Sequence, residues 1–171
     1  MLQQKMEESE AYKRSLLGAI NKSVIVSIAG LDGKIKEVND AFVDVSKYAR
    51  EELIGKDHRI VNSGLHPKSL WYEMWRDIKK GISWRAEVRN KTKYGLYYWV
   101  DNVVNPIFDN NNNIIEYLSI RYDITQKKNA EFNLLELNKN LENLVEERTK
   151  DLSNAIKDLD QQNEELLHTQ N

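Results

Sequence analysis

The sequence predicts an α+β fold: a five-stranded antiparallel sheet with helices on one face, flanked by an N-terminal helix and a long C-terminal coiled-coil helix. Between residues 22 and 125, strand-like and helix-like segments follow in the order β-β-α-α-loop-α-β-β-β. Beyond residue 125 neither glycine nor proline occurs, and leucines recur at helical spacing. We therefore expect three parts: a flanking helix at 1–21, a compact head at 22–125 and a helical tail at 126–171.

The flanking helix and the first two strands are predicted from simple patterns. Apolar residues at helical spacing indicate a helix over 3–20. Residues 23–29 and 34–38 are β-branched and alternate in polarity, and the Gly-Leu-Asp-Gly turn at 30–33 joins them. This arrangement is typical of a hairpin.

Two short helices are expected after the hairpin. Asn39 and Asp40 suit the cap of a helix over 41–48, because their side chains can accept backbone N–H groups. A second helix over 50–54 is followed by Gly55, a residue suited to a left-handed C-terminal position.

The second half of the head combines a loop, a helix and three strands. Residues 56–67 show no periodicity, which indicates either a functional loop or a plain connector. A helix is predicted over 68–80, with an aromatic-rich stripe of Leu70, Trp71, Met74, Trp75 and Ile78. Strands are predicted at 84–92, 97–108 and 114–124, joined by turns at 93–95 and 109–113.

Composition excludes several classes of function. The 171 residues contain no cysteine, so the chain has no disulfide, no thiolate metal site and no cysteine nucleophile. A net charge of -2 argues against nucleic-acid binding. No stretch approaches the roughly 20 apolar residues of a membrane span, so we expect no membrane insertion by this chain and a cytoplasmic location. No defensible pairing of nucleophile and base indicates an enzyme, and no metal site is expected.

Three segments of the head resemble the PAS domain family. They read GLDGKIKEVNDAFVDVSKYAREELIGK, WRAEVRNKTKYGLYYWV and PIFDNNNNIIEYLSIRYDIT. The most specific residues are Asn39, Phe42 and Tyr48, the run from Glu51 to Gly55, and the closing residues Arg121, Asp123, Ile124 and Thr125. The resemblance covers 22–125 and implies a sensory module of a signal-transduction protein.

A narrower resemblance points to a cofactor. The stretches IVNSGLHPKSLWYEMW and KGISWRAEVRNKTKYG are similar to the flavin-binding PAS domains of aerotaxis transducers and of the nitrogen-fixation regulator NifL. In those proteins a helix tryptophan and a strand asparagine lie against the flavin ring, and the matching positions are Trp75 and Asn90. His58 falls on a loop position that carries glutamate in NifL. The resemblance implies FAD, used as a redox or oxygen sensor.

The residue types at these positions suit a flavin. Trp71 and Trp75 are spaced i and i+4, so they share a helix face, and the Asn90 amide could hydrogen-bond the ring edge. Weaker candidates are Trp71, His58, Asn62 and His66. A light-sensing flavin domain forms an adduct with cysteine, which this sequence lacks, so a redox or oxygen role remains.

Other interpretations of the same residues stay open. The tryptophans could be ordinary core residues, and Asn90 could satisfy backbone groups. His58 and His66 are conceivable haem ligands, although haem is disfavoured against FAD, and His66 beside Pro67 could serve only the start of a helix. The rival from another class is a cofactor-free PAS domain that acts in dimerisation and signal relay.

The pattern of the tail predicts a dimer partner and a downstream effector domain. Its apolar positions form one narrow stripe, as expected of a coiled coil with a second copy: Leu134, Leu137, Leu141, Leu144, Leu152, Ile156, Leu159 and Leu166. We expect a homodimer through the flanking helices. Residues 141–170 resemble the linker that precedes the dimerisation helix of sensor histidine kinases. The expected parent is such a kinase, with its effector domain beyond residue 171, and a diguanylate cyclase or chemoreceptor output is the alternative.

Overall fold

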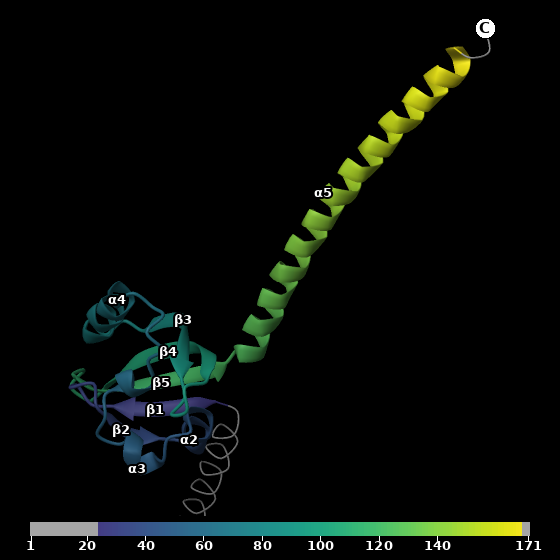
Figure 1. Ribbon diagram of the computed structural model, residues 1–171. Coiled ribbons are helices and arrows are strands. Elements are labelled where there is room, and N and C mark those ends of the chain that lie inside the picture. The colour runs from purple at the N-terminus through teal and green to yellow at the C-terminus, as the bar shows by residue number, and fades with distance from the viewer. Residues whose placement is uncertain (1–23, 169–171) are drawn as a thin grey trace, which may run out of the picture. The chain divides into compact units, whose positions relative to one another are not determined.

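The computed structural model describes residues 24–168, so the helix predicted over 3–20 lies outside the described residues. Five strands form one sheet in the order β2-β1-β5-β4-β3, and every neighbouring pair is antiparallel (Figure 1). The strands are β1 (Ile25–Ala29), β2 (Ile35–Val38), β3 (Trp84–Lys91), β4 (Tyr97–Phe108) and β5 (Ile114–Asp123). The predicted fold class is confirmed.

The strand register defines an inner face of the sheet. Ser27 on β1 pairs with Ser119 on β5, and Arg121 on β5 pairs with Asn102 on β4. Because side chains alternate along a strand, these residues and their neighbours two positions away point to the same side. Buried and more exposed residues alternate in this way along β1, β4 and β5.

Four helical elements complete the head. They are α2 (Asp40–Ser46), α3 (Arg50–Leu53), the 3₁₀ helix η1 (His58–Val61) and α4 (Lys68–Lys79). Helix α2 contacts β1, α3 contacts β2, and α4 contacts β3 and β4, so helices lie along the whole width of the sheet (Figure 1). The core between them and the inner face includes Phe42, Leu53, Ile78 and Val100, all fully or almost fully buried.

One side chain anchors α2 to the sheet. The Asn39 side-chain oxygen accepts the N–H of Phe42 at 3.1 Å and the N–H of Val26 at 3.0 Å. The Asn39 amide nitrogen donates to the carbonyl of Val24 at 2.6 Å. The predicted helix cap therefore also ties the helix start to β1.

The loop expected at 56–67 is partly helical. Asp57 accepts the backbone N–H of Arg59 at 2.8 Å and starts η1. A single 3₁₀ turn has too few residues to produce a detectable hydrophobic period, so the sequence pattern does not predict it. Helix α4 begins at Lys68, so Pro67 occupies the cap position and not the first helical position.

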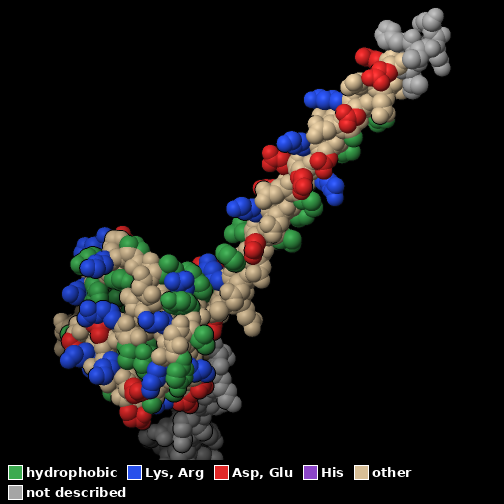
Figure 2. Space-filling model, viewed as in Figure 1, with side chains coloured by type: hydrophobic (Ala, Val, Ile, Leu, Met, Phe, Trp, Pro, Cys, Tyr) green, Lys and Arg blue, Asp and Glu red, His purple; other side chains and the backbone are tan. Residues whose placement is uncertain are grey.

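The tail is a single helix, α5 (Thr125–His168), and the boundary between the two compact units falls between Gln126 and Lys127. Its apolar side chains from Leu134 to Leu159 are all exposed, and Figure 2 shows them interspersed with charged groups. Within residues 24–168, no helix combines the length and the hydrophobicity needed to cross a membrane.

Candidate functional site

The inner face of the sheet carries an unusual number of buried polar side chains. We call five of them the polar floor: Ser27, Asn90, Asn102, Ser119 and Arg121. Their exposed fractions range from 1% to 5%. Positions that face a core are usually apolar, because each buried polar group must find a hydrogen-bond partner or lose its hydration without compensation. The polar floor therefore distinguishes this face from an ordinary core.

Arg121 is a buried cation on β5. Its Nη1 donates to Ser27 Oγ at 3.0 Å, and its guanidinium carbon lies 5.0 Å from the centre of the Phe42 ring. Burial lowers the pKa of Arg121 to about 10, so the group remains charged at neutral pH. Within residues 24–168 no carboxylate forms an ion pair with it.

His58 lies beside this cation and is neutral. Its Nε2 is 2.9 Å from Ser27 Oγ, and its ring stacks on Phe42 with 6.4 Å between centroids. Burial, followed by the proximity of Arg121, lowers the pKa of His58 to about 3. Because Arg121 donates to the Ser27 oxygen, the Ser27 proton is available to Nε2 of the neutral imidazole. The residue His58 keeps some exposed surface, but its ring reaches the polar floor.

A second group of polar atoms lies toward β3 and β4. The Tyr98 hydroxyl is buried, and within the described residues it has no partner at hydrogen-bonding geometry. Burial raises the pKa of Tyr98 to about 12, although the nearby Asn90 amide acts in the opposite direction. Ser119 Oγ donates to Asn102 Oδ1 at 3.0 Å. The Tyr98 hydroxyl therefore has hydrogen-bonding capacity that the described chain does not use.

The two predicted tryptophans of α4 have different neighbours. The Trp75 ring meets Tyr117 edge-on at 5.7 Å and lies against Gly33 in the β1–β2 turn. A Cβ on Gly33 would be 3.0 Å from the Trp75 ring, and Gly33 has φ +79°, so the turn accommodates the indole only as glycine. The Trp71 ring lies 6.2 Å from Trp84. Trp75 thus faces the β1 and β5 side of the core, and Trp71 the β3 side.

Asn62 and His66 lie along the free edge of β3. Asn62 forms an isolated antiparallel bridge with Asn90, and its own side chain accepts the N–H of Gly64 at 2.8 Å. His66 Nε2 accepts the Arg89 N–H at 2.8 Å. Burial, then the charge of Arg89, lowers the pKa of His66. In this structure the His66 side chain therefore satisfies a backbone N–H at the edge of β3.

The structure therefore distributes the six predicted residues over three places. His58 lies with Ser27 and Arg121 under α2. Asn62, His66 and Asn90 lie at or beside β3. Trp71 and Trp75 lie on α4, where the Trp71 ring meets the His66 ring edge-on at 6.2 Å.

Sequence reasoning missed most of the polar floor. Ser27, Asn102 and Ser119 were not singled out, and Arg121 was used only as a family marker. The signal was present, since all four occupy the inward phase of strands whose neighbouring inward positions are apolar, such as Ile25 and Val100. A polar residue in the buried phase of an alternating strand is the pattern that identifies such a site.

Known proteins resemble the head in sequence and in structure. A family model described as the PAS fold matches residues 35–121. The aerotaxis receptor of Escherichia coli is 35% identical over 108 residues, covering 63% of this chain and 21% of that protein. The nitrogen fixation regulatory protein of Klebsiella pneumoniae is 26% identical over 103 residues, covering 60% of this chain and 21% of that protein. The chain spans about a fifth of the length of these relatives.

Among solved structures, an RNA-binding light-oxygen-voltage receptor superposes with a TM-score of 0.64. Its identity is 19%, and the match covers 74% of this chain and 37% of that chain. At this identity the likeness concerns the fold alone.

Proposed function

Because the chain belongs to the PAS family of sensory domains in signalling proteins, we propose that its polar floor binds FAD and that the head senses redox state or oxygen. The observation that carries the proposal is the buried Tyr98 hydroxyl, which has no hydrogen-bond partner at good geometry within the described residues and lies beside the buried Asn90 amide. Buried polar groups are nearly always satisfied, and an orphaned one calls for an explanation. A ligand with a polar edge supplies that explanation.

The residues present fit a flavin ring. Ligand sites combine apolar walls with a few fixed polar groups. Trp75 supplies a flat apolar surface, while the amides of Asn90 and Asn102 each carry a donor and an acceptor. FAD would contribute reversible electron uptake, and the side chains would bind the ring, orient it and set its polar surroundings.

The proposed signal is redox and not light. The sequence contains no cysteine, so no thiol is available for a photoadduct. The resemblance to aerotaxis and nitrogen-fixation regulators supports the same choice.

The tail supports a dimeric relay. Seven side chains of the predicted stripe, Leu134, Leu137, Leu141, Leu144, Leu152, Ile156 and Leu159, are between 49% and 64% exposed. Apolar residues in this spacing are stabilised when two helices pack together, and an isolated helix gains little from them. The proposed occupant of the stripe is the tail of a second copy. The proposed parent is a cytoplasmic histidine kinase with its effector beyond residue 171.

The head also holds the start of α5. Thr125 Oγ1 accepts the Trp99 N–H on β4 at 2.9 Å, and Asp123 Oδ1 accepts the Thr125 N–H at 2.8 Å. A change at the inner face of β4 or β5 therefore acts on residues that begin the tail.

An absorption spectrum tests the proposal. Purified protein, reconstituted with FAD and freed of excess, is expected to show the two flavin bands and to lose them with dithionite. Asn90→Ala should weaken FAD binding about tenfold, as loss of a buried hydrogen bond implies. Asn110→Ala, in the exposed β4–β5 turn, is the matched control.

A flat spectrum after reconstitution would contradict the proposal. The rival function, a cofactor-free relay module, would then be favoured, because parts of the polar floor already satisfy one another through Ser119 and Asn102.

A further inference from the structure

Among residues 24–168, Arg121 holds a positive charge in the core without a negative partner. Its exposed fraction is 4%, and its one hydrogen bond within residues 24–168 goes to the neutral oxygen of Ser27. A guanidinium has five N–H donors in a planar fork, so most of its donors are unused. Isolated buried charges are costly and are normally paired.

The neighbouring ionisable groups do not compensate this charge. His58 and Tyr98 are neutral at pH 7, as their pKa values of about 3 and about 12 indicate. Asp57 is close to His58 but pairs with Arg59 at 3.0 Å. The charge of Asp123 acts on Tyr98 and raises its pKa, but the Asp123 carboxylate accepts the Thr125 N–H. As far as the chain is described, the inner face therefore carries one positive charge that no negative group pairs with.

We propose that Arg121 is the counter-ion for the negative charge that a flavin acquires on reduction, so that the head binds reduced FAD more tightly than oxidised FAD. This inference rests on the proposed function. Two electrons from a reductant and one proton from solvent convert the neutral oxidised ring into a ring with one negative charge. An oxidant such as molecular oxygen removes the electrons again and returns the ring to neutrality, with release of that proton.

The chemistry of the fork favours this role. Charge-assisted hydrogen bonds are about twice as strong as neutral ones, and a planar guanidinium can bond two adjacent acceptors at once. The oxidised ring offers such acceptors without a charge, whereas the reduced ring adds the attraction between opposite charges in a poorly solvated site. Arg121 should therefore discriminate between the two redox states, and Asn90 should bind both.

Ser27 and His58 position the cation. Ser27 Oγ fixes one arm of the fork, and its proton is available to His58 Nε2. The backbone of Gly33 also acts on His58 and opposes the lowering of its pKa, but burial and Arg121 have the larger effect. A neutral His58 also avoids placing a second positive charge beside Arg121.

The test compares affinities for oxidised and reduced FAD in the full chain. Binding of oxidised FAD is measured by flavin fluorescence, and the midpoint potential of the complex is measured by anaerobic dithionite titration against a reference dye. Arg121→Gln is expected to lower the ratio of reduced to oxidised affinity about tenfold. For a two-electron couple, that tenfold change lowers the midpoint potential of the complex by about 30 mV.

Two variants separate this role from a packing role. Arg121→Lys keeps the charge and should retain most of the preference for the reduced state. Arg59→Gln removes an exposed arginine of η1 and should leave the ratio unchanged within about twofold. If Arg121→Gln folds poorly, Ser27→Ala removes only the hydroxyl that holds the fork, and a ratio several-fold below that of the unmodified chain is expected.

The outcomes distinguish the two proposals. An unchanged ratio in Arg121→Gln or Ser27→Ala, with oxidised FAD still bound, overturns the counter-ion role and leaves the FAD proposal standing. Failure of the unmodified chain to bind FAD in either redox state overturns both.

Discussion

The head and the tail treat polar and apolar side chains in opposite ways. The head buries a cation, two asparagines and two serines on its inner face, while the tail exposes a stripe of leucines. Each arrangement is unfavourable for an isolated molecule, since buried polar groups need partners and exposed apolar stripes tend to be covered. The comparison teaches that the two regions call for different kinds of partner, and the proposed ones are FAD for the head and a second helix for the tail.

The largest expected effect concerns acid and the polar floor. The unfolded state takes up a proton on His58 near pH 6.5, while the folded state resists protonation until about pH 3. This contribution to stability is complete above pH 6.5 and is lost as pH falls toward 3, at roughly 1 kcal/mol per pH unit. Urea unfolding between pH 7 and pH 4 should show a steeper loss in the unmodified chain than in His58→Gln.

Equal slopes in the two proteins would mean that His58 is not held neutral beside Arg121. The head would then differ less from the tail, because one of its buried groups would not be held in an unusual protonation state. Carboxylates titrate in the same range, but they are common to both proteins, so the difference between the slopes isolates His58.

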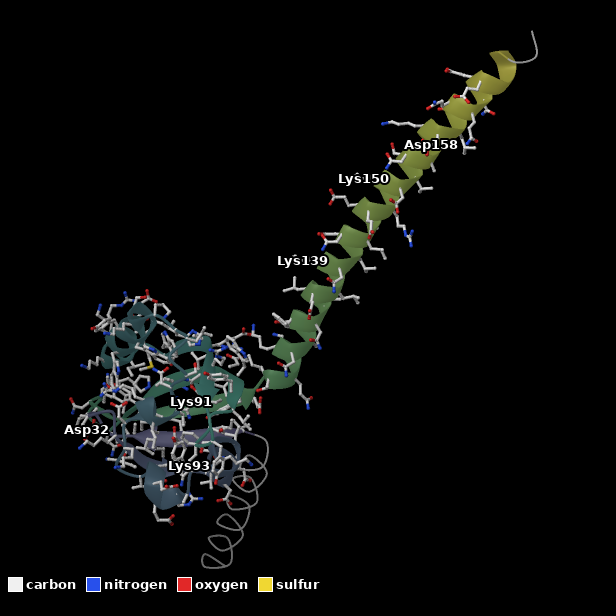
Figure 3. The ribbon with its side chains drawn as sticks, in the orientation of Figure 1. Asp32, Lys91, Lys93, Lys139, Lys150 and Asp158 are labelled. Carbon is white, nitrogen blue, oxygen red and sulfur yellow. The ribbon has the colours of Figure 1, made fainter. Side chains whose placement is uncertain are left out.

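The second effect tests the tail. Leu152→Asp places a charge in the stripe and should weaken self-association at least about a hundredfold. Sedimentation equilibrium measures the change. Lys150→Asp, two residues away and off the stripe, introduces the same side chain as a control (Figure 3). A chain that remains monomeric before any substitution would refute the second copy as the occupant.

The third effect separates structural from ligand-directed polar groups in the head. Asn39 is nine-tenths buried like the polar floor, but its side chain is fully engaged with Val24, Val26 and Phe42. Asn39→Ala should therefore lower the free energy of unfolding by about 2 kcal/mol. Added FAD should not restore this loss relative to the unmodified chain. A loss below that of Asn110→Ala would show that the cap contributes little.

The smallest effect lies where the two regions meet in sequence. Thr125→Val removes the hydroxyl that accepts the Trp99 N–H and should cost about 1 kcal/mol of local stability. Hydrogen exchange at the Trp99 amide should accelerate about fivefold. Thr149→Val is the control, because the Thr149 hydroxyl bonds only the Val145 carbonyl within α5. If the Trp99 amide exchanged equally fast in both variants, the Thr125 hydroxyl would not be what holds the start of α5 to β4.

The sequence predicted the sheet well because alternation records which side of a strand is buried. Strand β4 was predicted at its observed bounds, and every other strand boundary lies within two residues of its predicted position. The 3₁₀ helix η1 was missed, since its single turn depends on the Asp57 side chain and on tertiary contacts of His58. Local pattern carries no information about such contacts.

The candidate site was harder to predict for the same reason. Ser27 and Arg121 are 94 positions apart and meet only because β1 and β5 are neighbours in the sheet. The neutral state of His58 likewise follows from burial beside Arg121 and not from its neighbours in the chain. Trp75 and Asn90 were inferred from resemblance, and their contact with a flavin stays a prediction.

The loop beside β3 has a consequence for aggregation. β3 is an edge strand, and exposed strand edges can recruit further strands from other molecules. Here His66 accepts the outward N–H of Arg89, and Ser63 donates to the Arg89 carbonyl at 2.5 Å. The loop that carries the predicted cofactor ligand His66 thus shields the edge against intermolecular β-pairing, and a proton on His66 Nε2 would expose that N–H to other chains in acid.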